Sequence, residues 1–155
     1  MKTLILAAML LAGCGGGPDA DVISRRGVQS FFGEAHETGM TAELADQMEN
    51  YLSNGLSAYG YAPYETDNAI LGLRVQWVTS PFFCSVSSTG LCDGESYLVG
   101  HAFKVNQSNT YKCPWLSAYI HEELHHIQYA KGIETDYKHT RPEWKLIDDR
   151  QNYCD

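Results

Sequence analysis

The chain has 155 residues, a formal net charge of -8 at pH 7 and a hydrophobic fraction of 44%. That length has room for one compact domain, and the balance of apolar and charged residues is ordinary for a globular protein. An acidic chain without a basic stretch lacks the electrostatic surface that binds nucleic acid or anionic lipid headgroups, so we expect neither contact.

The N-terminal residues have the features of a secretion signal. Lys2 supplies a positive charge, Leu4 to Leu11 form a short apolar run, and the sequence Leu-Ala-Gly that follows ends at Cys14. This segment resembles the lipobox signal of bacterial lipoproteins. The resemblance implies cleavage before Cys14, a lipid on Cys14 that holds the chain to the membrane, and an extracytoplasmic location at the periplasm or cell surface. The alternatives are a plain apolar N-terminus or an uncleaved anchor, although the run is short for a membrane span of about 20 residues.

The predicted organisation therefore has three parts. Residues 1–13 form the signal, residues 14–20 form the lipidated cysteine and a glycine-rich spacer, and residues 21–155 form a single domain. Glycine runs behave as flexible coil, so the spacer would hold the domain near the membrane. Loss of Lys2 with the signal takes the formal charge to -9.

Four cysteines remain after Cys14, namely Cys84, Cys92, Cys113 and Cys154. In an oxidising compartment, four cysteines indicate two disulfides, for which the sequence allows three pairings. We favour Cys84 with Cys92 and Cys113 with Cys154. A zinc site of cysteines is the alternative, but the four cysteines have no C-x-x-C spacing, which is typical of such sites.

The pattern of apolar residues predicts two long helices with strands between them. From Thr41 to Tyr59, apolar residues recur every three or four positions, which indicates an amphipathic helix that Gly60 and Pro63 end. Residues 70–79 alternate between apolar and polar, which predicts a strand. Residues 81–94 form a loop, residues 96–105 a second strand and residues 106–110 a turn.

The second long helix extends from Trp115 to Lys131. Pro114 suits a first helical position and Gly132 a terminator, and one stripe of the helix is apolar. A last short helix begins near Pro142 and contains Trp144 and Ile147. The predicted fold is α+β, with a small antiparallel or mixed sheet packed on the two long helices.

This second helix carries the sequence His121-Glu122-Glu123-Leu124-His125. Histidines four residues apart project from the same helical face, so His121 and His125 can bind one metal ion. Glu122 lies about 100° further round the helix, where it can reach a water on that ion without binding the ion itself. His126 turns away from the His121 face, which favours a surface position or a supporting role for it.

The pattern H-E-x-x-H on a helix resembles the active-site helix of the zincin metallopeptidases. The resemblance covers this helix and the helix-then-strands order before it. It implies a zinc ion bound by His121, His125 and a third ligand, with Glu122 as the catalytic residue that polarises a zinc-bound water. The metzincin subgroup is excluded, because Gln128 and Lys131 stand where that subgroup has glycine and histidine.

Three residues are candidates for the third ligand. His139 would complete a site of three histidines with an open fourth position, which suits zinc. Asp136 imitates the ligand of the aspzincins and could instead orient His139. Glu143 lies at a workable distance for a gluzincin, but Ile147 replaces the aspartate expected four residues later. We favour His139, then Asp136, then Glu143.

These features predict an extracytoplasmic zinc metallopeptidase that hydrolyses a peptide or protein substrate with a zinc-bound water activated by Glu122. A noncatalytic surface lipoprotein with a structural or metal-capturing zinc site is the alternative, and a closed site of four protein ligands would support it. A third possibility is a binding protein stapled by disulfides in which the motif is accidental. The substrate and the oligomeric state are not readable from the sequence.

Overall fold

The computed structural model describes residues 19–33, 35, 38–85, 90–106, 114–133 and 139–150. The predicted signal, Cys14, the pairing of Cys113 with Cys154, and Asp136 lie outside these residues. None of the helices in the described ranges is long and apolar enough to cross a membrane.

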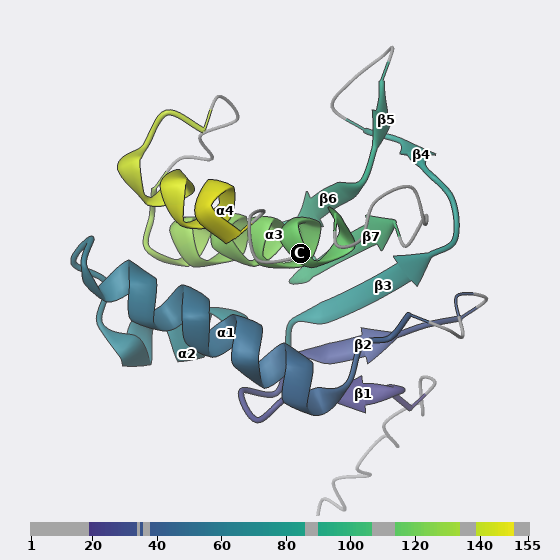
Figure 1. Ribbon diagram of the computed structural model, residues 1–155, viewed down its shortest axis with the longest axis horizontal. Coiled ribbons are helices and arrows are strands. Elements are labelled where there is room, and N and C mark those ends of the chain that lie inside the picture. The colour runs from purple at the N-terminus through teal and green to yellow at the C-terminus, as the bar shows by residue number, and fades with distance from the viewer. Residues whose placement is uncertain are drawn as a thin grey trace, which may run out of the picture.

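The fold is α+β, with a mixed sheet of five strands, a hairpin of two short strands and helices on one side of the sheet (Figure 1). The strand order in the sheet is β1-β2-β3-β7-β6. Strands β2, β3 and β7 are parallel, whereas β1 and β6 run antiparallel to their neighbours at the two edges. The elements in chain order are β1 (Val22–Ile23), β2 (Gln29–Phe31), α1 (Ala42–Ser57), α2 (Pro63–Ile70), β3 (Arg74–Val78), β4 (Phe82–Phe83), β5 (Leu91–Cys92), β6 (Gly94–Tyr97), β7 (Ala102–Asn106), α3 (Pro114–Ala130), the 3-10 helix η1 (Pro142–Trp144) and α4 (Lys145–Arg150).

Both long helices are confirmed. Thr41 caps α1, because its hydroxyl oxygen accepts a hydrogen bond from the backbone N–H of Leu44 at 3.1 Å. The predicted apolar stripe of α1 is buried at Met48, Leu52 and Leu56. Helix α3 begins at Pro114, as the sequence predicts, and packs against β6 and β7.

The sequence patterns predict no element between the end of the first helix and the strand at residues 70–79, but the structure has a short helix there. Pro63 does not only end α1; it also occupies the first turn of the short helix α2, where proline loses no hydrogen bond because the first N–H groups of a helix lack intrahelical partners. The Glu65 carboxylate accepts a hydrogen bond from the backbone N–H of Ala62 at 2.8 Å and thereby closes the start of this helix. An eight-residue helix has few periodic positions, which is why the sequence pattern does not show it.

The predicted strand at residues 70–79 is shorter in the structure, because Ile70 still belongs to α2 and β3 begins at Arg74. Leu73, Val75 and Trp77 are buried on the helical side, as the alternation predicts, but Leu71 is 62% exposed. The backbone at Leu71 and Gly72 forms the turn between α2 and β3, so Leu71 does not share the strand's inward face.

The predicted single strand at residues 96–105 is wrong, because the chain reverses within it. Strands β6 and β7 form an antiparallel hairpin in which Tyr97 pairs with Ala102. His101 has a φ of 48°, in the left-handed region, and its backbone N–H donates to the Leu98 carbonyl at 3.2 Å. A turn built on a histidine rather than on an Asn-Gly pair has no strong sequence signal.

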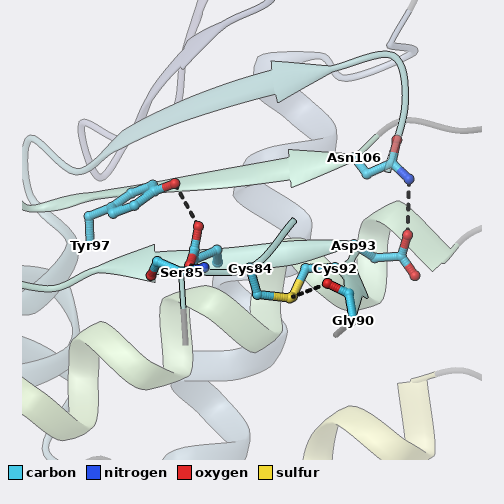
Figure 2. Close-up of a disulfide and its surroundings, with 8 residues drawn as sticks. Cys84, Ser85, Gly90, Cys92, Asp93, Tyr97 and Asn106 are labelled. Atoms are coloured by element: carbon cyan, nitrogen blue, oxygen red, sulfur yellow. Dashed lines mark hydrogen bonds between the residues drawn. A yellow bond between two sulfur atoms is a disulfide. The ribbon is translucent and has the colours of Figure 1, made fainter. Parts of the chain in front are cut away.

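The predicted loop at residues 81–94 contains a small hairpin. Strands β4 and β5 pair antiparallel, and the predicted disulfide between Cys84 and Cys92 is present (Figure 2). Asn106 at the end of β7 donates a side-chain hydrogen bond to Asp93 at 2.9 Å, which ties the base of this hairpin to the sheet. The hairpin projects beyond the sheet, and β6 follows directly from it (Figure 1).

Candidate metal site on helix α3

Helix α3 is buried along most of its length. Its apolar stripe of Ile120, Leu124 and Ile127 faces the core, as predicted. The polar residues between them are covered as well: Glu122 is 5% exposed and His125 is 8% exposed. Covered ionisable side chains on a helix need partners, because burial of an isolated charge is costly. The neighbours of each of these side chains therefore define what the helix can do.

The structure brings His121, His125 and His139 together. One ligand atom from each lies within 4.8 Å of the other two, so the three side chains can hold a metal ion. The Nε2 atoms of His125 and His139 are 3.4 Å apart. Two nitrogen ligands at 2.0–2.1 Å from a tetrahedral zinc ion lie about 3.4 Å apart. This pair is therefore already spaced for a shared ion.

The backbone of His139 has a φ of 51°, in the left-handed region that few residues other than glycine adopt. Such a conformation costs free energy and persists only where surrounding contacts impose it. Here the contacts are with the rings of His121 and His125, whose centroids lie 4.6 Å and 5.3 Å from the His139 ring. The local backbone thus turns the third imidazole toward the helix.

The surroundings of His121 favour the uncharged form of its imidazole, which is the form that binds metals. Burial, and then the neighbouring His139, lower the pKa of His121 to about 4. At neutral pH its imidazole is therefore uncharged, with a lone pair available for an ion.

A tryptophan packs against all three histidines. The Trp144 ring centroid lies 4.9 Å from that of His121, 4.8 Å from that of His125 and 4.1 Å from that of His139. Trp144 ends η1 and is buried, so the predicted short helix does reach the core. Its role beside the histidines has no signal in the sequence.

Strand β6 holds Glu122. The Ser96 hydroxyl donates a hydrogen bond of 2.7 Å to Oε2 of Glu122, and a Cβ atom built on Gly94 would lie only 2.5 Å from Oε1. The carboxyl therefore fits against bare backbone at Gly94. Burial raises the pKa of Glu122 to about 7, against the Ser96 hydrogen bond, and the Glu95 charge raises it further. Gly94 and Ser96 are not detectable from the sequence, because they meet Glu122 only through the pairing of β6 with β7.

Glu143, one of the alternative third ligands, has other partners. Its Oε1 atom accepts hydrogen bonds from Tyr61 at 2.8 Å, from Gln128 at 3.2 Å and from Arg141 at 2.6 Å. This carboxylate is 1% exposed and belongs to a network that joins η1 to α3. Among the described residues, it is not part of the group that could hold an ion.

The remaining histidines with described positions are structural. His126 turns away from the His121 face, as predicted, but the surface position suggested for it is wrong. Its ring is 2% exposed, and its Nε2 lies 3.1 Å from the carbonyl oxygen of Ala102 on β7. His101 lies 3.0 Å from the Leu71 carbonyl oxygen in the same way. His36 lies outside the described residues.

A second buried cluster lies between α3 and α1. The Tyr119 hydroxyl donates to Oε1 of Glu49 at 3.0 Å and also lies close to the Glu123 carboxyl. Burial raises the pKa of Glu49 to about 7. Burial, and then the Glu49 charge, raise that of Glu123 well above its ordinary value. Glu123 therefore belongs to the core, although it stands inside the histidine motif.

Comparison of the chain with protein-family models, with curated proteins and with solved structures finds no match. An interpretation of the site therefore depends on the chain's own residues, and above all on the three histidines whose ligand atoms converge.

Proposed function

We propose that this chain is an extracytoplasmic zinc-dependent metallopeptidase in which His121, His125 and His139 bind the zinc ion and Glu122 is the catalytic base. The observation that carries the proposal is the convergence of three histidine ligand atoms within 4.8 Å of one another. The resemblance of the motif to that of the zincins agrees with it.

The donor set fits zinc. Three neutral imidazoles with a fourth position left for water are a usual catalytic zinc environment. When bound, zinc lowers the pKa of a coordinated water to about 7 and polarises a carbonyl. Among the described residues, no fourth protein ligand joins the three histidines. Glu143, one of the residues that could close the site, is bonded to Tyr61, Gln128 and Arg141 instead, which favours an open site over the closed, structural site of the noncatalytic alternative.

Glu122 has the properties of a general acid and base. A group whose pKa lies near the working pH can both accept and donate a proton, and burial brings the pKa of Glu122 to about 7. In the proposed reaction, Glu122 accepts a proton from the attacking water and passes it to the departing amine. Ser96 holds one carboxylate oxygen, which leaves the other for the proton transfer.

The proposed location is extracytoplasmic, with membrane attachment through a lipid on Cys14. The disulfide between Cys84 and Cys92 supports this, because disulfides persist mainly in oxidising compartments. The proposed partner is a peptide or protein substrate.

Metal analysis and a cleavage assay test the proposal on purified chain that starts at residue 14. We expect one zinc per chain, and we expect Glu122→Gln to keep that zinc but to lose cleavage of a diverse peptide library followed by mass spectrometry. Glu43→Gln, on exposed surface of α1, is the matched control. Less than one zinc per chain under metal-replete conditions contradicts the metal site. Equal cleavage by the parent and Glu122→Gln rejects the mechanism, and zinc without any cleavage favours the noncatalytic alternative.

A further inference from the structure

Trp144 occupies a position that its burial alone does not explain. Its ring contacts three histidines that come from two separate parts of the chain, with ring centroids between 4.1 Å and 4.9 Å away. The indole Nε1 is buried and has no hydrogen-bond partner among the described residues. What holds the ring in place is therefore its packing, and much of that packing is against the histidines.

The three histidine rings form a triangle, and the Trp144 ring lies over one of its faces. The centroids of His121, His125 and His139 are 4.6 Å to 5.3 Å apart, and the Trp144 centroid is at a similar distance from each. A point equally near to three corners of a triangle lies over its centre. The indole therefore fills the space on one side of the histidine triangle.

The segment that carries the indole is held by hydrogen bonds at the neighbouring residue. It ends the 3-10 helix η1, whose Glu143 carboxylate is bonded to Tyr61, Gln128 and Arg141. Glu143 is almost fully buried, so this network fixes the segment next to the tryptophan. These bonds hold in place the backbone of η1 that carries Trp144.

We propose that Trp144 is the rear wall of the metal site: it holds the three imidazoles in their converging arrangement and closes one side of the ion to further ligands. An ion bound by the histidines then receives its fourth ligand only from the side opposite the indole. Such a site favours ions that readily adopt four-coordinate geometry, such as Zn²⁺ and Co²⁺, over ions that require six ligands. This inference rests on the proposed metal binding but not on the proposed peptidase activity.

Cobalt spectroscopy tests whether Trp144 limits the coordination of the bound ion or is only an ordinary core residue. Four-coordinate Co²⁺ absorbs visible light intensely, whereas six-coordinate Co²⁺ absorbs weakly. We expect the intense spectrum for the parent and for Trp144→Phe, which keeps a ring against the histidines. Trp144→Ala should show a weaker spectrum and a zinc affinity lower by about 10- to 100-fold, the range for residues that orient metal ligands.

Trp77→Leu is the matched control, because Trp77 is also buried but stacks on Tyr119, with ring centroids 6.1 Å apart. We expect it to lower thermal stability while leaving the cobalt spectrum and the zinc affinity unchanged. An unchanged spectrum and affinity in Trp144→Ala would overturn the proposal, as would equal changes in both variants.

A measurement that does not use Trp144→Ala covers the case in which that variant does not fold. Bound Co²⁺ should quench the fluorescence of a tryptophan that touches its ligands, and this quenched fraction should be missing in Trp144→Phe. If cobalt binds at the triad without quenching this fluorescence, the proposed role of Trp144 is contradicted. A parent that binds neither Zn²⁺ nor Co²⁺ instead contradicts the metal site itself, so the two failures are distinguishable.

Discussion

Helix α3 carries two clusters of buried ionisable side chains, and they differ in what they can bind. On one side, His121 and His125 meet His139 with their ligand atoms within 4.8 Å. On the other side, Glu123 meets Tyr119 and, from α1, Glu49. The α3 members of both clusters come from one stretch of seven residues, Tyr119 to His125, which is about two helical turns.

The clusters differ in the uncharged form that each adopts to avoid the free-energy cost of a buried charge. The His121 imidazole is neutral because its pKa falls, and it keeps a lone pair for an ion. The carboxyls become neutral by keeping a proton, since burial raises their pKa, and in that form they are poor ligands. His139 is also exposed, whereas Glu123 is 0% exposed, so only the histidines can receive an ion from solvent. Buried charge on a helix is therefore not by itself a site.

The largest effect should follow from removal of a histidine of the triad. We expect His125→Ala to lower zinc affinity by more than about 100-fold, beyond the loss caused by residues that only orient ligands. Isothermal titration calorimetry with zinc measures this. His101→Asn is the control, because asparagine tolerates the φ of 48° at this position and His101 lies outside the triad. Equal losses in both variants would contradict the assignment of the ligands.

The carboxyl cluster should respond to pH rather than to metal. The pKa of Glu49 is about 7 in the folded chain and 4.5 in an ordinary setting, so the folded state holds a proton that the unfolded state releases between these values. The contribution of Glu49 to stability is therefore greatest below pH 4.5 and falls as the pH rises to about 7. The groups that act on Glu49 are Ser24, Arg26, Asp46 and Tyr119, and the charge of Glu49 in turn raises the pKa of Glu123.

We therefore expect Glu49→Gln to be more stable than the parent at pH 8, by up to about 3 kcal/mol, and to lose this advantage near pH 4.5. Urea unfolding at the two pH values measures the difference. Glu43→Gln, an exposed substitution on the same helix, should show little change at either pH. A gain that is independent of pH would reject a raised pKa at Glu49.

The smallest effect should come from the strand that supports Glu122. A methyl group at Gly94 would meet the Glu122 carboxylate at 2.5 Å, so Gly94→Ala must displace that side chain at a cost of about 1–2 kcal/mol in stability. At Gly100 the nearest atom to an added Cβ is 3.6 Å away, which makes Gly100→Ala the matched control. Thermal unfolding of the two variants checks this, and equal melting temperatures would contradict the contact.

Sequence patterns identified the elements whose signals are local. The stripes of α1 and α3 and the alternation of β3 arise from burial of one face, which imposes a period on the sequence. The short disulfide loop follows from two cysteines close together in the chain. The two N-terminal strands and α2 were missed because elements of two, three or eight residues have too few positions to show a period.

By itself, the sequence determined the histidine face of α3, which is the candidate metal-binding face, because a spacing of four residues puts His121 and His125 one above the other on any helix. Only the tertiary structure decided the rest of the site. It brought His139 to these two histidines, engaged Glu143 with Tyr61, placed Trp144 over the three rings and set Gly94 against Glu122. These contacts join residues that are distant in the chain, and such residues meet only when the sheet order and the packing of the helices are fixed.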